Sequence, residues 1–392
     1  MSDISSNNSI DLPAELPRVF VQEKILKDAP APLNDSGVFG WLLRNLFQNV
    51  WQTTASIVTI FFLGWLFWQI AEFAILNAVW VGDDREACSV EIGRSLGACW
   101  AFVGDRLGYF IYGAYPVEER WRVNVFFFLG AVVLGHVLWL NAPFKRLGLL
   151  AAFVLFPVVA FVLLNGWPAL GLSEVTTDRW GGLMVTLVVA GVGIVAALPI
   201  GIILALGRRS KLPVVRLFSI ALIELPRGVP LITVLFLANT MLPLFLPADV
   251  NPDKLVRALV GITFFAAAYL AEIVRGGLQA IPLGQYEASQ ALGLGYWRTM
   301  AFVVLPQAIK VAVPNIVSIN IGLFKDTSLL LIVGIFDFLS AIETARIDPQ
   351  WAAPTVSATG YAFAAMVYFV FCFGMSRYGS FTEKHLSRGH NN

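Results

Sequence analysis

Long apolar stretches dominate the chain, and they follow a polar, proline-punctuated start over residues 1–38. Each stretch is long enough to cross the roughly 30 Å hydrocarbon layer of a bilayer as a helix. The predicted spans are 55–79, 122–140, 147–165, 183–207, 219–246, 258–276, 307–335 and 357–378. Because no basic segment leads into an apolar run at the start, we expect no cleavable signal peptide. The pattern predicts eight membrane-spanning helices.

The amino-acid composition also favours a membrane protein with many spans. Hydrophobic residues make up 57% of the chain and charged residues only 14%, too few to cover the surface of a soluble protein. Lipid offers the backbone no hydrogen-bond partner, so the spans must be helical and we expect an all-α polytopic fold. The formal net charge of +1 gives no support for a nucleic-acid partner.

The Lys and Arg residues predict the orientation. With the N-terminus in the cytoplasm, the inner segments carry sixteen of them and the outer segments ten. Since positive charge favours the cytoplasmic side, both termini are expected inside. The long loop 80–121 then lies outside and holds Cys88 and Cys99. In an oxidising compartment these two could be bridged, although two unpaired small residues fit the sequence equally well.

Several catalytic signatures are absent from the sequence. No Lys follows a Gly, so there is no Walker A loop for ATP phosphates, and there is no His-Glu-x-x-His or Cys-x-x-Cys motif. We therefore expect no enzyme and no cofactor or metal in this chain. Gly and Pro interrupt two spans, at 198–201 and 225–230. Membranes tolerate such breaks where protein or water covers the freed backbone groups, as along a transport path.

A short helix in the loop between the sixth and seventh spans is the most specific prediction. Pro282 suits a first helical turn and Gly293 suits a helix end. The loop reads Glu-Ala-Ser-x-x-x-Gly, nine further residues and Val-x-Leu-Pro, and its marked residues are Tyr286, Glu287, Ala288, Ser289, Gly293, Leu305 and Pro306. This spacing resembles the EAA loop of ABC importer permeases, which docks on the ATPase. The alternative is an ordinary amphipathic helix on the membrane surface.

The words that flank this loop narrow the resemblance. Residues 272–277 (Glu-Ile-Val-Arg-Gly-Gly), 305–308 (Leu-Pro-Gln-Ala) and 323–329 (Leu-Phe-Lys-Asp-Thr-Ser-Leu) resemble the polar amino acid permeases. The three added N-terminal spans resemble the M-type permease subunit of general L-amino acid importers. The resemblance implies a type I ABC permease in the bacterial inner membrane. It implies as partners a second related permease, two ATPase subunits that hold ATP and Mg, a periplasmic binding protein and an L-amino acid substrate of broad or polar and acidic range.

The spans and the resemblance together divide the chain into four parts. We expect a cytoplasmic tail over 1–54 and three additional spans over 55–165, with the long outer loop 80–121. A five-helix core follows over 180–380, with the coupling loop at 276–306, and a second cytoplasmic tail covers 381–392.

Ionisable residues inside predicted spans are candidates for the transport path, because charge in a membrane is costly. The candidates, with two hydroxyl residues that could cap a broken helix, are Glu224, Arg227, Lys325, Asp326, Thr327 and Ser328. Together they could partner both charged groups of an amino acid. The alternative is a set of structural ion pairs that neutralise one another. Glu272 and Arg275 are expected at the cytoplasmic end, in the coupling machinery.

Two other functions stay open. An ion-coupled secondary amino acid transporter would need its own ion site and would normally show repeated halves, and no second copy of the 180–380 pattern is evident. A non-transporting membrane scaffold would not need the EAA-like loop. We therefore predict an ABC permease subunit, surrounded by membrane lipid, that has no ATPase site of its own.

Overall fold

The computed structural model describes residues 37–89, 97–247 and 250–387. Regular structure in these ranges is helical, apart from two isolated β-bridges, Val79 to Cys99 and Gly182 to Asp337. The expected all-α fold is therefore confirmed. The chain divides into two units, Met1–Ile70 and Ala71–Asn392.

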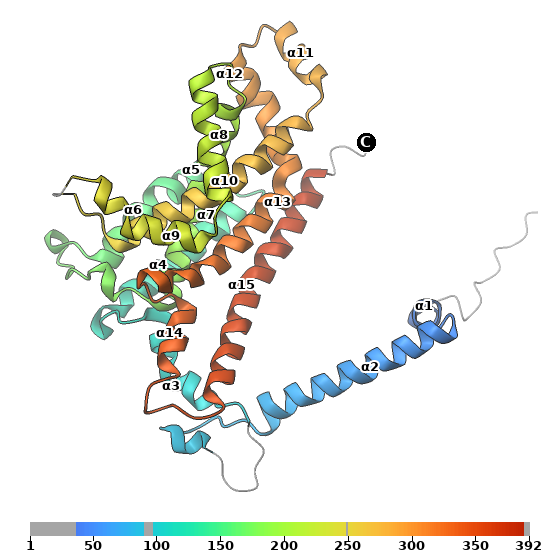
Figure 1. The fold of residues 1–392 in the computed structure, drawn as a ribbon, viewed down its shortest axis with the longest axis vertical. Helices are drawn as coiled ribbons and strands as arrows, with labels where there is room; N and C mark the ends of the chain where they lie inside the picture. The colour runs from blue at the N-terminus through green and yellow to red at the C-terminus, as the bar shows by residue number, and fades with distance from the viewer. Residues whose placement is uncertain (1–36, 90–96, 248–249, 388–392) are drawn as a thin grey trace, which may run out of the picture. The chain divides into compact units, whose positions relative to one another are not determined.

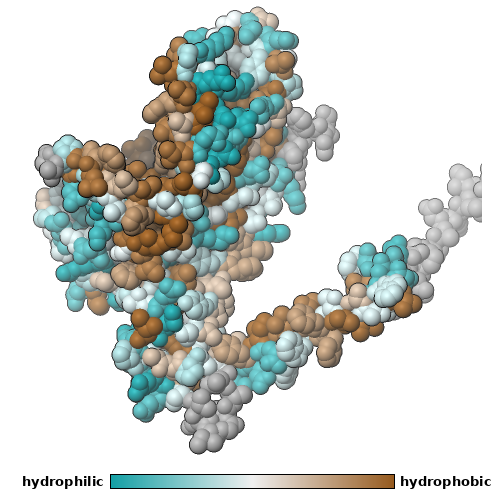
Figure 2. Space-filling model, in the orientation of Figure 1, coloured by the Kyte–Doolittle hydropathy of each residue, from teal (hydrophilic) through white to brown (hydrophobic). Residues whose placement is uncertain are grey.

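The first unit contains α1 (Gly37–Leu46) and most of α2 (Val50–Ala71). No residue of α2 is buried, and Figure 2 shows apolar side chains along much of it. A helix that is apolar all round is typical of a membrane span. The span begins at Val50, earlier than the predicted 55, because Asn49 Oδ1 accepts the backbone N–H of Gln52 at 2.9 Å and so caps the helix one turn upstream.

Seven helices in the described ranges are long and apolar enough to cross a membrane. They cover Val50–Leu76, Val117–Leu138, Lys145–Asn165, Gly182–Arg208, Lys254–Gln279, Tyr296–Val333 and Val356–Leu386. Each overlaps a predicted span. Tyr296–Val333 is the longest of these seven. It is long because the loop helix α12 (Tyr296–Thr299) continues through the π-helical turn η8 (Met300–Val304) into α13 (Leu305–Asp326).

The fifth predicted span, 219–246, is wrong as a single helix. It consists of α8 (Pro213–Arg227) and α9 (Leu231–Thr240), bent by 110° across a short break. Pro230 precedes α9 in an extended conformation and has no backbone N–H to continue a helix. The Pro and Gly residues at 225–230 therefore change the direction of the chain, whereas those at 198–201 lie within one continuous helix, α7 (Gly182–Arg208).

The centre of the second unit is the pair α7 (Gly182–Arg208) and α10 (Lys254–Gln279). Gly201 of α7 lies so close to α10 that an added Cβ would be 2.9 Å from Leu270 Cβ and 3.0 Å from the carbonyl oxygen of Ala267. Small residues permit such close contact between membrane helices. The helix α15 (Val356–Ser387) packs on α13 beside this pair, with Phe324 against Tyr368 and Phe371.

Two of the added spans share a hydrophobic core with α7 and α10 through α4 (Arg120–Leu138) and α6 (Phe156–Asn165), which are linked by α5 (Lys145–Leu150) and the π-helical turn η4 (Ala151–Leu155). Arg122 of α4 is almost completely buried and forms an ion pair with Glu119 at 2.7 Å. Its guanidinium also donates to the backbone oxygen and the hydroxyl of Ser173, both at 2.8 Å. These partners offset the desolvation of the buried charge and fix the 166–175 segment beside the added spans.

Different helices form the two ends of the second unit. In Figure 1, α11 (Leu283–Ala291) and α12 lie at one end of its long dimension, and α3 (Trp100–Tyr112) and α14 (Phe338–Ala345) lie at the other. Figure 2 shows apolar side chains over much of the face between them. Short 3₁₀ turns occupy Arg85–Cys88, Val117–Glu119, Pro168–Leu170, Thr177–Arg179, Leu242–Phe245 and Thr327–Val333.

Candidate functional site

The predicted loop helix is present as α11, nine residues long. It starts after Pro282, and it ends at Gly293, whose φ of +73° is a left-handed conformation that glycine adopts without strain. The backbone N–H of Leu294 donates back to the Ser289 carbonyl at 3.0 Å and closes the helix end. Tyr286, Glu287, Ala288 and Ser289 of the motif are therefore on a defined helix that lies outside the spanning segments.

The two faces of α11 differ. Ser289 is buried, and its hydroxyl donates to the Gln285 carbonyl at 2.7 Å, whereas Glu287 and Ala288 are exposed. Three apolar side chains beside them, Leu283, Leu292 and Trp297, are between 73% and 80% exposed. Exposed apolar residues grouped around a carboxylate are typical of a protein-binding surface.

The second part of the motif is fixed to α11 by a side-chain contact. Gln307 Nε2 donates to Gln285 Oε1 at 3.1 Å and to the Val303 carbonyl at 2.8 Å. Pro306 has no N–H for the helical bond to the residue four positions earlier, and the preceding turn is the π-helix η8, in which the Leu305 N–H bonds to Met300. The Gln285–Gln307 contact thus joins the two parts of the motif, which lie on α11 and at the start of α13.

Four of the predicted charged residues meet in one cluster, with a fifth that the sequence did not indicate. We call Arg208, Glu224, Arg227, Glu272 and Arg275 the ion network. Arg208 Nη1 lies 2.7 Å from Glu224 Oε1 and 2.6 Å from Glu272 Oε1, so it joins α7 to both α8 and α10. Arg227 pairs with Glu224 at 3.2 Å, as their spacing predicts, and Arg275 pairs with Glu272 at 2.7 Å.

The sequence predicts a different grouping of these charges from the one in the structure. Glu224 and Arg227 were grouped with the transport path, and Glu272 and Arg275 with the cytoplasmic end, but the structure brings all four together. Arg208 is not among the candidate residues that the sequence indicates. No helical periodicity could have joined it to Glu272, which is 64 residues further along the chain.

Lys325 and Asp326 do not form the mutual ion pair that the structural alternative assumed, because none of the ion pairs among the described residues joins the Lys325 ammonium to the Asp326 carboxylate. Asp326 lines a cavity of about 220 Å³ between α10 and α13, together with Phe265, Tyr269 and Ser318. Lys325 is exposed. The two side chains therefore serve different surroundings.

The helix α13 ends at Asp326, and a 3₁₀ helix, η9, continues from Thr327 to Val333. Thr327 is fully buried, and its hydroxyl donates to the Phe324 carbonyl at 2.8 Å. Ser328 is half-buried. The expected helix break is thus a change from α to 3₁₀ geometry, and Thr327 bonds to the end of α13 rather than capping a new helix.

The cavity and the ion network are neighbours along α10. Tyr269 lines the cavity, and the Arg227 guanidinium lies 5.8 Å from the centre of its ring. Glu272 follows one helical turn later on the same face. An apolar cavity with one carboxylate thus leads directly to a group of three guanidiniums and two carboxylates.

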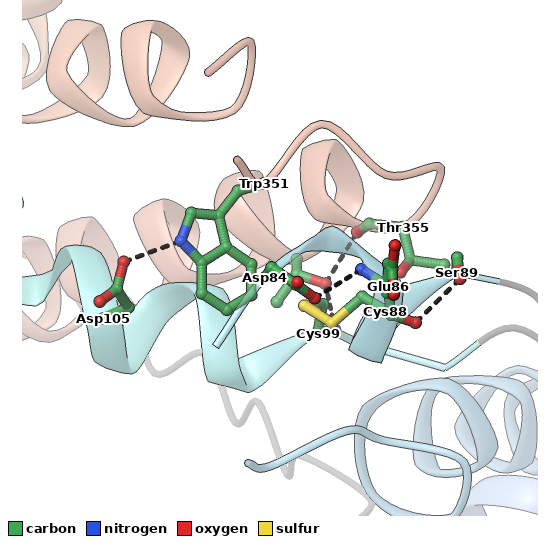
Figure 3. Close-up of a disulfide and its surroundings, with 9 residues drawn as sticks. Asp84, Glu86, Cys88, Ser89, Cys99, Asp105, Trp351 and Thr355 are labelled. Atoms are coloured by element: carbon green, nitrogen blue, oxygen red, sulfur yellow. Dashed lines mark hydrogen bonds between the residues drawn. A yellow bond between two sulfur atoms is a disulfide. The ribbon is translucent and has the colours of Figure 1, made fainter. Parts of the chain in front are cut away.

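Cys88 and Cys99 form a disulfide, which selects one of the two arrangements that the sequence left open. Around it, residues 77–89 and 97–112 pack against residues 337–359, and we call this assembly the disulfide layer. Trp351 is fully buried and donates from Nε1 to Asp105 Oδ2 at 2.7 Å, as Figure 3 shows. Arg106 pairs with Asp348 at 2.9 Å. The layer lies at the end of the second unit opposite α11 (Figure 1).

Within the disulfide layer, Asp337 caps α14. Its carboxylate accepts backbone N–H groups from Leu339 at 3.2 Å and Ser340 at 3.1 Å, and it accepts the Tyr368 hydroxyl at 3.2 Å. Burial raises the pKa of this carboxyl above its usual value, although the hydrogen bonds from Ser340 and Leu339 act in the opposite direction. Asp337 therefore stabilises the attachment of α14 to the spans.

Comparison with known proteins agrees with this geometry. The family model described as "Binding-protein-dependent transport system inner membrane component" matches residues 197–387. The inner membrane amino-acid ABC transporter permease protein YhdY of Escherichia coli is 46% identical over 364 residues, which cover 92% of this chain and 96% of that protein. The glutamate/glutamine/aspartate/asparagine transport system permease protein BztC of Rhodobacter capsulatus is 36% identical, with coverage of 95% and 99%.

A solved structure titled "Crystal structure of an amino acid ABC transporter with histidines" is 27% identical, covers 52% of this chain and 92% of that chain, and gives a TM-score of 0.45. The similarity to YhdY and BztC extends over the added spans as well as the motif-bearing core. The chain belongs to the family of binding-protein-dependent transport system inner membrane components.

Proposed function

We propose that this chain is the permease subunit of an ATP-driven importer that moves L-amino acids from an external binding protein into the cytoplasm. The observation that carries the proposal is α11, a short exposed helix held to the start of a membrane span by the Gln285–Gln307 contact. Two relatives that match the chain over 92% and 95% of its length are named as amino-acid or glutamate, glutamine, aspartate and asparagine permeases. An acidic or polar amino acid is therefore the substrate class to test first.

The proposed orientation rests on the two ends of the second unit. A disulfide persists in an oxidising compartment, so the disulfide layer faces outward and α11 faces the cytoplasm, where ATP is hydrolysed. The count of Lys and Arg supports the same direction. If the bent pair α8 and α9 counts as one crossing, the spans in the described residues number eight, and an even number leaves the two termini on the same side, which the outward disulfide layer makes the cytoplasmic one.

The proposed partners follow from what the chain itself lacks in its sequence. Without a Walker A loop it depends on two ATPase subunits that bind ATP and Mg, and α11 is the docking element for one of them. One chain supplies one such helix, so a second related permease supplies the other. The partly exposed side chains of Arg227 and Asp326 then line a path between the two permeases and offer opposite charges to an amino acid zwitterion.

Transport by the reconstituted complex tests the proposal. The permease is purified with its partner permease and ATPase, placed in proteoliposomes with ATP inside, and supplied with binding protein and labelled amino acids. Glu287→Lys should abolish uptake and copurification with the ATPase, because it reverses the exposed charge on α11. Glu118→Lys, an equally exposed acid at the other end of the unit, is the matched control and should leave uptake intact.

The same preparation separates the proposal from a secondary transporter. Uptake that continues without ATPase subunits and stops when ion gradients are dissipated would contradict the proposal. The orientation has its own measurement in a chain with Cys372 replaced by Ala: Ser210→Cys should react with a membrane-impermeant maleimide only from the cytoplasm, and Asp83→Cys only from outside. Reaction of Ser210→Cys from outside would reverse the topology.

A further inference from the structure

Two adjacent arginines at the end of α7 contact different helices. Arg208, the last residue of α7, bonds through Nη1 to Glu224 on α8 and to Glu272 on α10. Arg209, the next residue, donates to the Tyr286 hydroxyl on α11 at 3.3 Å, and its guanidinium lies 5.9 Å from the centre of the same ring. A single step along the backbone therefore connects the loop helix to the ion network.

The ion network is also in contact with the cavity that holds Asp326. Tyr269 belongs to the wall of this cavity and lies against Arg227 of the network. Asp326 and Tyr269 line the same cavity, and from Tyr269 the contacts continue through Arg227, the ion network and the Arg208–Arg209 backbone to Tyr286 on α11. Coupling between distant sites travels through such contiguous contacts when an element along them has two arrangements.

The charges of the network make Arg208 its central member. Three guanidiniums face two carboxylates, and Arg208 is the one that contacts both carboxylates at under 3 Å, from a single nitrogen. Without it, Glu224 and Glu272 retain only Arg227 between them, at 3.2 and 3.8 Å.

We propose that the Arg208–Arg209 pair transmits the movement of α11 into α8 and α10, with Arg208 as the positioning residue of the inner end of the path. This inference rests on the proposed function. When the ATPase shifts α11, Arg209 moves with Tyr286, and Arg208 is drawn away from one of its two carboxylates. α8 and α10 then separate beside the cavity. Arg208 touches no substrate in this scheme and acts through the two carboxylates.

The experiment compares amino acid imported per ATP hydrolysed in the complete complex. Arg208→Gln and Arg209→Gln are each expected to lower this ratio about tenfold, a usual size for coupling between sites, while the complex still copurifies and hydrolyses ATP. Arg216→Gln is the matched control, because Arg216 is an exposed arginine on α8 outside the network, and it should leave the ratio unchanged.

The single-nitrogen contact of Arg208 provides a sharper readout. Because one nitrogen makes both contacts, Arg208→Lys should restore most of the ratio. Arg275 bonds Glu272 through two nitrogens, Nε and Nη2, so Arg275→Lys should restore less relative to Arg275→Gln. A residue needed only for folding would not show this difference between the two lysine variants.

The outcomes separate the inference from the function on which it rests. If the wild-type complex imports no amino acid, the proposed function fails and the inference fails with it. If the wild type imports and both glutamine variants keep its ratio of transport to hydrolysis, only the inference is overturned. Should Arg208→Gln fail to insert, the exposed Arg209→Gln still decides, because its side chain takes no part in packing the spans.

Discussion

Removal of the Cys88–Cys99 disulfide should loosen the disulfide layer without unfolding the spans. Both sulfur-bearing residues are buried, so alanine is the suitable replacement at both positions. The rest of the layer is attached independently, by Arg106 to Asp348 and by Trp351 to Asp105. The double variant Cys88→Ala/Cys99→Ala is therefore expected to fold, insert and copurify with its partners.

The expected size of the effect follows from the length of the loop that the disulfide closes. Its sequence separation is 11, and the chain-entropy relation assigns about 3 kcal/mol to a loop of this length. A free-energy change of about 1.4 kcal/mol is tenfold in an equilibrium constant, so local opening of the layer should become roughly a hundredfold more frequent.

Hydrogen exchange measured on backbone amides of the layer tests this estimate. The informative amides are those of Val79, Ala98 and Cys99, which bond to Ala98, Phe73 and Thr359 respectively. Their protection should fall by about two orders of magnitude in the double variant, while amides of α10 keep theirs. Cys372→Ala, which removes the free thiol in α15, is the control. Protection that changes less than about threefold would refute the assignment of this stability to the disulfide.

Three further changes have defined outcomes. Gly293→Ala should destabilise the end of α11 by about 1–2 kcal/mol, because its φ of +73° is left-handed, and should lower ATPase copurification, whereas the same change at exposed Gly284 should not. Asp326→Asn should lower amino acid uptake about tenfold with ATP hydrolysis retained, and Lys325→Met should have a smaller effect, since only Asp326 lines the cavity; equal effects would remove the cavity from the path. Since burial raises the pKa of Asp337, the folded state holds its proton more tightly, and stability should fall as pH rises from the ordinary carboxyl range to the raised value. Asp337→Asn should flatten this part of a melting-temperature profile against pH, and an unchanged profile would contradict the argument.

The spans and α11 could be predicted from the sequence because their signals are local. A long apolar stretch predicts a membrane span from its own composition. Pro282 and Gly293 mark the start and the end of α11 through their own backbone preferences, without contacts from elsewhere in the chain. The same locality explains the error at 219–246. Hydropathy measures how apolar a segment is and carries no information on its direction, so the 110° bend between α8 and α9 was read as one straight span.

The ion network could not be predicted as a whole, because its members meet only through packing. Arg208 and Glu224 are 16 residues apart, and Arg208 and Glu272 are 64 apart, so no helix or strand period relates them. Two pairs in the network, Glu224 with Arg227 and Glu272 with Arg275, could be predicted because a separation of three residues places both side chains on the same face of a helix. The contact between Arg208 and Glu272 depends on the close approach of α7 to α10, which Gly201 permits.

The disulfide layer imposes an order on biosynthesis. Arg106 and Asp348 are separated by 242 residues, and Cys99 and Thr359 by 260, so the first half of the layer emerges long before its partner is translated. Oxidation of Cys88 and Cys99 needs only 11 intervening positions and can be completed while the ribosome is still making the spans. The disulfide then stabilises the early half of the layer until the 337–359 segment has been translated. Assembly of this surface is therefore completed only late in the synthesis of the chain.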